Sequence, residues 1–312
     1  MKMRVAVWAR IACAALLCLC SGIVAAADGD SGRSHVLVIG RISDDPASHY
    51  AQLKALLDYV VPRMGDVGIR EGQVLMARDA QQMASYLRRG RVDWVTETPG
   101  TALQLQDRAG ATCMLLAERN GVQTYRTVFF VRKDSPVRTL DDLRGRTLAL
   151  QRIASTSAYL VPAAELLGNG MRLEVLASHD DVPSPDTVGY LLARSELNIA
   201  SWVHKGLADA GALSDLDWNN PNRVPAAFRR DFRIIHEIAP YPRALELARG
   251  TLDPKVEARL REVLLQASDD PQARPALREF FGTTRFLAID PATRQSLDRL
   301  RRGIARVRLE VE

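Results

Sequence analysis

The sequence predicts an α/β protein built from two lobes, with a ligand cleft between them and a hinge of two chain segments. Short β-branched runs alternate with stretches whose apolar residues recur at helical spacing, which is typical of layered α/β domains. A polar stretch at 133–136 (KDSP) interrupts this alternation, and the pattern then resumes. The 312 residues are 47% hydrophobic and 25% charged, which excludes disordered, collagenous and polytopic membrane proteins.

The first 27 residues have the pattern of a secretory signal peptide. Three basic residues open this leader, residues 11–24 are apolar, and three alanines end it at Ala27. We therefore expect cleavage after Ala27, export to the periplasm and no membrane span in the mature chain. The alternative is a lipoprotein anchored at Cys18 or Cys20, but a leucine precedes each cysteine where a small residue is needed.

The mature chain is nearly neutral and nearly free of cysteine. Removing the three basic residues of the leader, which has no acid, lowers the formal net charge from +5 to +2. A charge this small gives no reason to expect a nucleic-acid partner. Cys113 alone remains outside the leader, so no internal disulfide can form. Its apolar surroundings predict a buried thiol and not a nucleophile.

The first lobe is predicted from alternating strand and helix patterns. The strands are expected at 35–40, 74–77, 91–96, 112–117 and 125–132, and the helices at 46–64, 79–89 and 99–109. Asp79 is a suitable N-cap for the second of these helices.

The second lobe is predicted from a renewed alternation after residue 136. Thr139 caps a short helix at 140–143, a longer helix is expected at 155–167, and strands are expected at 147–151, 172–176, 197–201 and 232–238. The remainder predicts helices at 254–267, at 271–281 and from 291 onward, with Asp-Pro pairs opening the first and last.

These patterns divide the chain into domains. After the signal peptide at 1–27, residues 28–134 and 235–312 are assigned to the first lobe and residues 135–234 to the second. A chain that leaves one lobe and returns to it forms a hinge of two segments, and ligands favour the cleft between such lobes.

Three consecutive hydroxyl residues, Ser155, Thr156 and Ser157, open the helix that follows the strand at 147–151. The first N–H groups of a helix lack partners within the helix, so an oxyanion placed there accepts several hydrogen bonds. The hydroxyls would add donors without adding charge. Ordinary N-capping by one of the three residues is the alternative.

Around this segment the chain resembles the phosphonate-binding family of periplasmic solute-binding proteins, which serve ABC importers for phosphate, phosphite and phosphonates. The resemblance covers nearly all of the mature chain. It is carried by the stretches 90–93 (GRVD), 125–136 (YRTVFFVRKDSP), 139–145 (TLDDLRG), 155–162 (STSAYLVP) and 178–180 (SHD). It implies a type II periplasmic binding protein with no catalysis, no metal and no cofactor.

The resemblance also implies roles for particular residues. Ser155, Thr156 and Ser157 match the segment that holds the phosphonyl oxygens, and His179 matches a histidine that reaches the same group. The alternative for His179 is a loop histidine bonded to backbone. Tyr125 resembles a family position but is expected to pack at the edge of the cleft.

Departures from the family pattern fall on the part of the pocket that recognises the ligand's tail. Glu97 and Thr98 stand where an aromatic residue usually follows the third strand. The acids that bind the amine of aminoalkylphosphonates correspond to the neighbourhoods of Lys205 and of Ala244 beside Arg243. We therefore expect no amine-binding acids, with Lys205 and Arg243 either facing an anion or lying solvated on the surface.

These expectations define a function. We expect a monomeric, non-catalytic binding component that closes on a small phosphorus oxyanion (phosphonate, phosphite or phosphate) and passes it to an inner-membrane ABC permease. A divergent member that signals to a membrane kinase or cyclase is the alternative. A serine hydrolase is not expected, because the chain lacks a Gly-x-Ser-x-Gly elbow.

Overall fold

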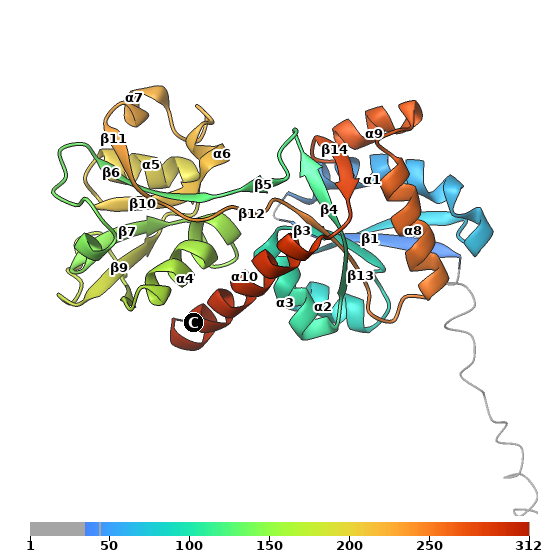
Figure 1. Ribbon diagram of the computed structural model, residues 1–312, viewed down its shortest axis with the longest axis horizontal. Coiled ribbons are helices and arrows are strands. Elements are labelled where there is room, and N and C mark those ends of the chain that lie inside the picture. The colour runs from blue at the N-terminus through green and yellow to red at the C-terminus, as the bar shows by residue number, and fades with distance from the viewer. Residues whose placement is uncertain (1–34, 44, 312) are drawn as a thin grey trace, which may run out of the picture.

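The computed structural model describes residues 35–43 and 45–311. The predicted leader, with the cleavage site after Ala27 and both candidate lipidation sites, lies outside these residues. Figure 1 shows two lobes side by side, each with a central sheet flanked by helices. No helix in the described part of the chain is both long enough and apolar enough to span a bilayer.

The first lobe contains a six-stranded mixed sheet in the order β14-β4-β13-β3-β1-β2. Its strands are β1 (Val36–Ile42), β2 (Glu71–Ala77), β3 (Trp94–Glu97), β4 (Thr112–Arg119), β13 (Leu245–Ala248) and β14 (Thr283–Leu287). β1 is parallel to both β2 and β3, and β13 is antiparallel to β3 and β4. β13 and β14 were missed in a region predicted to be helical. β13 is fully buried and β14 has only five residues with two adjacent exposed positions, so neither shows a regular alternation of buried and exposed residues.

Helices cover both faces of this sheet. On one face α1 (Pro46–Val60), α8 (Pro254–Gln266) and α9 (Arg274–Glu279) pack around Trp94, and on the other α2 (Ala80–Arg88) and α3 (Pro99–Ala109) pack around Val95. Successive residues of β3 therefore point into different cores. The predicted N-cap at Asp79 is confirmed, since its side chain accepts a hydrogen bond from the Gln82 N–H.

The second lobe has its own six-stranded sheet, in the order β11-β6-β10-β7-β9-β8. Its elements are β6 (Thr127–Arg132), β7 (Arg146–Leu150), α4 (Val161–Gly168), β8 (Arg172–Val175), β9 (Thr187–Leu192), α5 (Glu196–His204), β10 (Ala210–Ser214), α6 (Asp215–Trp218), α7 (Ala226–Arg229) and β11 (Phe232–Glu237).

One strand predicted in this lobe is wrong. Residues 197–201 lie inside α5, which begins where the Ser195 hydroxyl accepts a hydrogen bond from the Asn198 N–H. Its buried residues Ile199, Ala200 and Val203 recur at helical spacing. The predicted strand has only three apolar residues, which is too short a pattern to distinguish a strand from a buried helix.

Two chain segments join the lobes. They form β5 (Thr124–Tyr125) and β12 (Tyr241–Pro242), which pair with each other in a small antiparallel sheet. The crossings therefore lie before β6 and after β11, and not at 134/135 and 234/235 as the sequence suggested. The reason is that β6 and β11 pair in the second sheet, and the sequence does not specify which sheet a strand joins.

The C-terminal helix α10 (Pro291–Glu310) makes a further connection between the lobes. It packs on α3 of the first lobe, on β12 and on α4 of the second lobe, and Figure 1 shows it running beneath the crossing strands. Gly303 permits a close approach to α4, because a Cβ atom there would lie 2.9 Å from the Cβ atom of Ala164.

Candidate functional site

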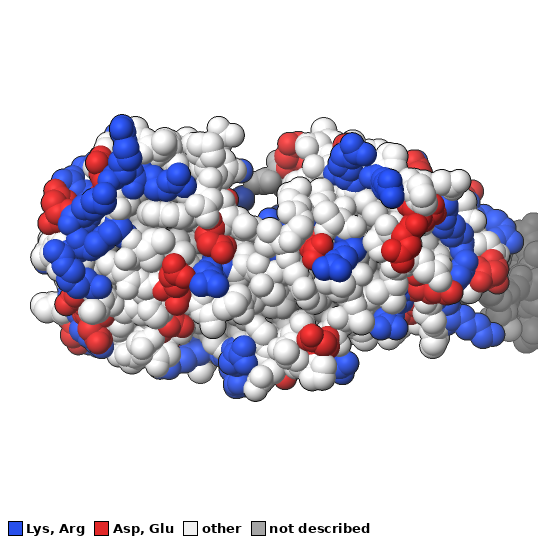
Figure 2. Space-filling model, turned by 45° about the horizontal axis from the view of Figure 1, so that its top comes forward, with Lys and Arg blue, Asp and Glu red and all other residues white. Residues whose placement is uncertain are grey.

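The candidate site lies where the two lobes face each other. In the first lobe β1 and β3 end there and α1 and α3 begin; in the second lobe β7 and β9 end there and α5 begins. Ligands of α/β proteins bind at the carboxyl ends of parallel strands, where helix N-termini also present free N–H groups. Figure 2 shows the surface hollowed between the lobes, with basic side chains visible inside the hollow.

The three consecutive hydroxyl residues open a π-helical turn, η4 (Thr156–Leu160), which runs into α4. The hydroxyl of Ser155 accepts a hydrogen bond from the Ala158 N–H at 3.2 Å, so Ser155 is an N-cap. The carbonyl of Ser157 accepts a hydrogen bond from the Thr127 hydroxyl at 2.8 Å. We call residues 155–157 the hydroxyl turn.

Thr156 links the hydroxyl turn directly to the first lobe. Its Oγ1 accepts a hydrogen bond from the N–H of Gly100 at 3.0 Å and donates to Oγ1 of Thr98, also at 3.0 Å. Thr156 is only 3% exposed. The structure thus brings together two predicted site residues, Thr98 and Thr156, from opposite lobes, although they hydrogen-bond to each other and to the backbone.

The crossing strands carry the predicted residues Tyr125 and Arg243. The ring of Tyr125 lies 4.6 Å from that of Tyr241, and the guanidinium of Arg243 lies 5.0 Å from the centre of the Tyr125 ring. Burial raises the pKa of Tyr125, while Arg243 and the nearby Ser157 hydroxyl oppose that rise. Tyr125 therefore packs at the hinge, as expected, and Arg243 lies beside it.

The sequence analysis missed two arginines of this region, Arg41 at the end of β1 and Arg119 at the end of β4. Their guanidinium carbons lie 4.3 Å and 4.7 Å from the centre of the Phe281 ring. Arg119 also donates from Nη2 to the hydroxyl of Thr96 at 2.8 Å, and Arg41 donates to the Thr96 carbonyl at 3.3 Å. The two side chains thus meet at the end of β3.

Neither arginine has an ionic partner in the described part of the chain. Among the described residues, no carboxylate lies within 4.0 Å of Arg41, Arg119 or Arg243, and the buried Nε atoms of Arg41 and Arg119 have no hydrogen-bond acceptor. Burial and, after it, the positive charge of Arg41 lower the pKa of Arg119 to about 9. Arg119 remains charged at neutral pH, so the site holds excess positive charge.

A signal for these arginines exists in the sequence. Each is a charged residue at the end of a buried apolar run, in HVLVIGR for Arg41 and in TCMLLAER for Arg119. Charges at the carboxyl ends of parallel strands are candidates for ligand contacts.

Glu97 occupies the same end of β3 but has a structural contact. It is 5% exposed, and its Oε1 accepts a hydrogen bond from the N–H of Ile42 at 3.0 Å. This bond ties the end of β3 to the end of β1. Glu97 and Thr98 were both predicted to lie where the ligand's tail is recognised. Thr98 lies at the interlobe contact, whereas Glu97 hydrogen-bonds to the neighbouring strand β1.

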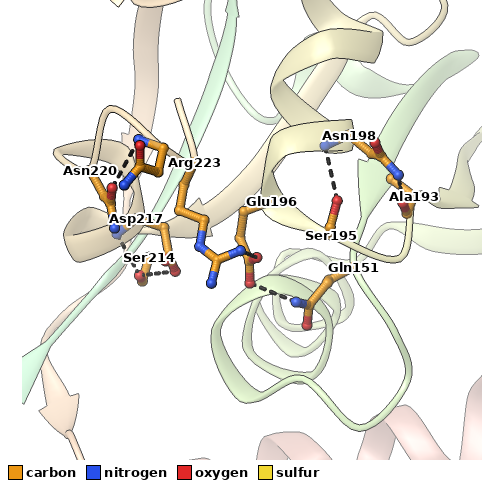
Figure 3. Close-up of polar contacts among 10 residues, drawn as sticks. Gln151, Ala193, Ser195, Glu196, Asn198, Ser214, Asp217, Asn220 and Arg223 are labelled. Carbon is orange, nitrogen blue, oxygen red and sulfur yellow. Dashed lines mark hydrogen bonds and ion pairs between the residues drawn. The ribbon is translucent and has the colours of Figure 1, made fainter. Parts of the chain in front are cut away.

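The sequence analysis expected no amine-binding acids at the aligned positions, and it did not consider two other acids of the second lobe, Glu196 and Asp217. Figure 3 shows Glu196 accepting a hydrogen bond from the Gln151 side chain at 2.6 Å, with Arg223 at 3.8 Å from its other oxygen. Asp217 accepts a hydrogen bond from the hydroxyl of Ser214. Burial, and then the charge of Asp217, raise the pKa of Glu196. The alignment behind the expectation crossed the Pro-rich loop at 182–187, which is longer than the family's usual spacing.

Lys205 does not lie in the site. It is exposed at the C-terminal end of α5, whose N-terminus is at the cleft. The carbonyl of the preceding residue, His204, accepts a hydrogen bond from Arg132 at the far end of β6. Because β6 starts at the hinge, Lys205 is at the end of the second lobe remote from the cleft.

His179 lies in the loop after β8, with 51% of its side chain exposed. Its Nε2 is 3.7 Å from Oδ1 of its neighbour Asp180, and its described contacts include no residue of the hydroxyl turn. In the described residues, no group of three histidine, cysteine or acidic side chains is placed to hold a metal ion.

Comparison with known proteins agrees with this architecture. Residues 39–293 match the family described as ABC transporter, phosphonate, periplasmic substrate-binding protein. The chain therefore belongs to this family, whose members are periplasmic, bind substrate and work with ABC permeases.

Solved structures give the same result. XAC2383 from Xanthomonas citri, bound to a chloride ion, is 58% identical over 89% of this chain and 100% of its own, with a TM-score of 0.85. The same protein bound to ATP is 56% identical over the same shares, with a TM-score of 0.84. PhnD1 from Prochlorococcus marinus, in complex with methylphosphonate, shares the fold at 16% identity and a TM-score of 0.62, over 87% of this chain and 99% of its own.

Proposed function

We propose that this protein binds a phosphorus oxyanion between the arginines of the first lobe and the hydroxyl turn of the second, and delivers it to an ABC importer in the inner membrane. The observation that carries the proposal is Arg119, a buried guanidinium that has no carboxylate partner among residues 35–43 and 45–311. It lies beside Arg41 and near Arg243, at the end of β3 where the lobes touch.

The energetics of burial support this ligand class. A buried charge without a partner costs several kcal/mol, and proteins relieve that cost with a counter-charge. The hydroxyl turn of the second lobe offers uncharged donors, the hydroxyls of Ser155 and Ser157 and the N–H groups of the turn. A dianion bound between the arginines and the hydroxyl turn would supply the guanidinium groups with a counter-charge and the neutral donors with hydrogen-bond acceptors.

The acids of the second lobe suit a ligand with a second polar group. Glu196 and Asp217 lie on the same side of that lobe as the hydroxyl turn. Glu196 accepts a hydrogen bond from Gln151, which is four residues before Ser155, and the charge of Asp217 adds to burial in raising the pKa of Tyr125 at the hinge. These acids would accept hydrogen bonds from an amine or hydroxyl on the ligand's tail. The Xanthomonas citri relative bound to ATP further supports phosphate esters as ligands. We therefore extend the proposal from small phosphonates to phosphate esters.

Isothermal titration calorimetry tests the proposal with phosphate, methylphosphonate, 2-aminoethylphosphonate and ATP. Arg119→Met removes the charge while keeping a long side chain, and we expect an affinity loss of at least about 30-fold, the effect of losing a charge-assisted hydrogen bond of about 2 kcal/mol. Lys205→Met removes a charge remote from the cleft and should change nothing. Equal affinity of Arg119→Met and wild type would contradict the proposed site, and thermal melting of each variant checks that it is folded.

We also propose that the mature chain begins at Asp28 in the periplasm, as a monomer. The family is periplasmic, and the leader has the order of a cleaved signal peptide. N-terminal sequencing of protein recovered from the periplasm tests the cleavage site. A lipid-modified N-terminus at Cys18 or Cys20 would contradict it.

A further inference from the structure

A buried carboxyl group lies directly behind the arginines of the proposed site. Glu246, on β13, is 0% exposed. Its Oε2 accepts a hydrogen bond from Nε1 of Trp94 and its Oε1 accepts one from the hydroxyl of Thr96, both at 2.7 Å. Neither donor is charged, and in the described part of the chain no basic group lies within ion-pair distance of Glu246.

Thr96 connects this carboxyl to the anion-binding side. Its hydroxyl accepts a hydrogen bond from Nη2 of Arg119 at 2.8 Å and donates to Glu246. The chain of hydrogen bonds therefore runs from the guanidinium of Arg119 through one hydroxyl to the carboxyl of Glu246. The pairing of Glu246 with Thr96 across β13 and β3 fixes this arrangement.

The charged and titratable groups around Glu246 are few. They are Arg119 and Cys113 on β4, Arg41 on β1, Glu97 on β3 and, beyond the Phe281 ring, His49 on α1. The core residues of α8 and α9 on this face are apolar. Burial raises the pKa of the Cys113 thiol to about 12, so this thiol stays neutral. Burial raises the pKa of Glu246 to about 7, with the charge of Arg119 as the main opposing influence.

We propose that Glu246 takes up a proton when an oxyanion binds at Arg119, so that anion affinity falls as the pH rises through neutrality. This inference rests on the proposed function. The positive charge of Arg119 would have to stabilise both an ionised Glu246 and the bound anion. Two negative charges in a buried region also repel each other strongly. Protonation of Glu246 from the solvent removes one of these charges.

The hydrogen bonds accommodate this proton. Protonation at Oε1 reverses the bond to Thr96: the two lone pairs of the hydroxyl then accept from Glu246 and from Arg119, and the Thr96 hydrogen gives up its bond to Oε1. Oε2 keeps the bond from Trp94. No covalent bond other than the O–H bond forms. Glu246 would therefore be a positioning residue that acts on the anion through Thr96 and Arg119.

Calorimetry with inorganic phosphate at pH 7, in buffers of different ionisation enthalpy, measures the protons taken up on binding. At this pH a carboxyl with a pKa of about 7 is already about half protonated, so we expect Glu246→Gln to take up fewer protons than wild type by up to about one half. Above pH 7 the wild-type affinity should fall more steeply with pH than that of Glu246→Gln, by up to about tenfold per pH unit. The ionisation of phosphate itself is common to both proteins and cancels in the comparison.

Two variants serve as controls. Glu118→Gln removes another nearly buried carboxylate of the same sheet, but Glu118 is paired with Arg285 at 2.9 Å, and that hydrogen-bonded partner lowers its pKa. His49→Gln removes the nearby imidazole. Both should keep the wild-type proton uptake, and loss of uptake in His49→Gln alone would assign the effect to His49 and overturn the inference.

The outcomes separate this inference from the proposed function. Phosphate binding with equal proton uptake in wild type and Glu246→Gln overturns the inference alone. Absence of phosphate binding by wild type counts against the proposed function. In that case infrared spectroscopy of the unliganded protein tests whether Glu246 titrates. A protonated-carboxyl band present at pH 6, lost at pH 8 and missing from Glu246→Gln supports a titrating Glu246, while its absence at both pH values overturns it.

Discussion

Replacement of Gly100 by alanine should prevent the lobes from touching while leaving each lobe intact. Gly100 is in the first turn of α3, and a Cβ atom there would lie 2.6 Å from Cδ1 of Leu160 and 2.7 Å from Oγ1 of Thr156. Cβ atoms essentially never approach other atoms this closely. Gly100 does not have a positive φ, so its backbone accepts alanine, and alanine favours a helix over glycine.

The expected loss of oxyanion affinity follows from the interlobe hydrogen bonds that Gly100→Ala would break. The N–H of Gly100 donates to Thr156, and Thr156 donates to Thr98, so opening the contact breaks two hydrogen bonds between neutral groups. At about 0.5–1.5 kcal/mol each, closure becomes about 1–3 kcal/mol less favourable. If the oxyanion is held by the closed form, its affinity falls by about 5- to 150-fold.

Two measurements check this prediction. Calorimetry with phosphate measures the affinity, and small-angle X-ray scattering with saturating ligand measures whether the lobes move apart. Gly168→Ala is the matched control, because Gly168 ends α4 and a Cβ atom there would meet nothing within 4 Å. Wild-type affinity and unchanged scattering in Gly100→Ala would refute the idea that binding needs this interlobe contact.

Two further predictions concern His179 and Glu246. His179→Ala should leave phosphate affinity within about twofold, since its side chain is half exposed and lies beside Asp180; a tenfold loss by calorimetry would show that its loop reaches the ligand. Between about pH 5 and pH 7 the wild-type free energy of unfolding should fall relative to that of Glu246→Gln, by up to about 3 kcal/mol, because the folded protein retains a proton that the unfolded chain has lost. Urea denaturation at pH 5 and pH 8 measures this difference, and a constant offset between the two proteins would contradict it.

Features that depend on a few neighbouring residues were predicted well. The Asp-Pro pairs at 253–254 and 290–291 open α8 and α10, and in both helices the aspartate side chain accepts a hydrogen bond from a backbone N–H in the first turn. Ser155 likewise opens the hydroxyl turn. A cap is satisfied by groups within three residues of it, so the local sequence contains all the information that it requires.

Features that depend on pairing between distant segments were predicted poorly. Arg119 and Glu246 come from strands far apart in the chain, and the register of β13 between β3 and β4 brings them together. β13 itself was not predicted. The placement of Lys205 failed for a related reason, since the direction of α5 away from the cleft follows from its packing on β10 and not from its own residues.

The sequence by itself determined the α/β class, the starts of α2, α8 and α10 and the hydroxyl turn, because hydrophobic periodicity and capping act over a few residues. Only the tertiary structure decided which strands share a sheet, where the chain crosses between lobes and which charges meet in the cleft. Sheet register positions Arg41, Arg119 and Glu246 relative to one another. Their electrostatic effect depends on burial and on the absence of partners, which are properties of the whole fold.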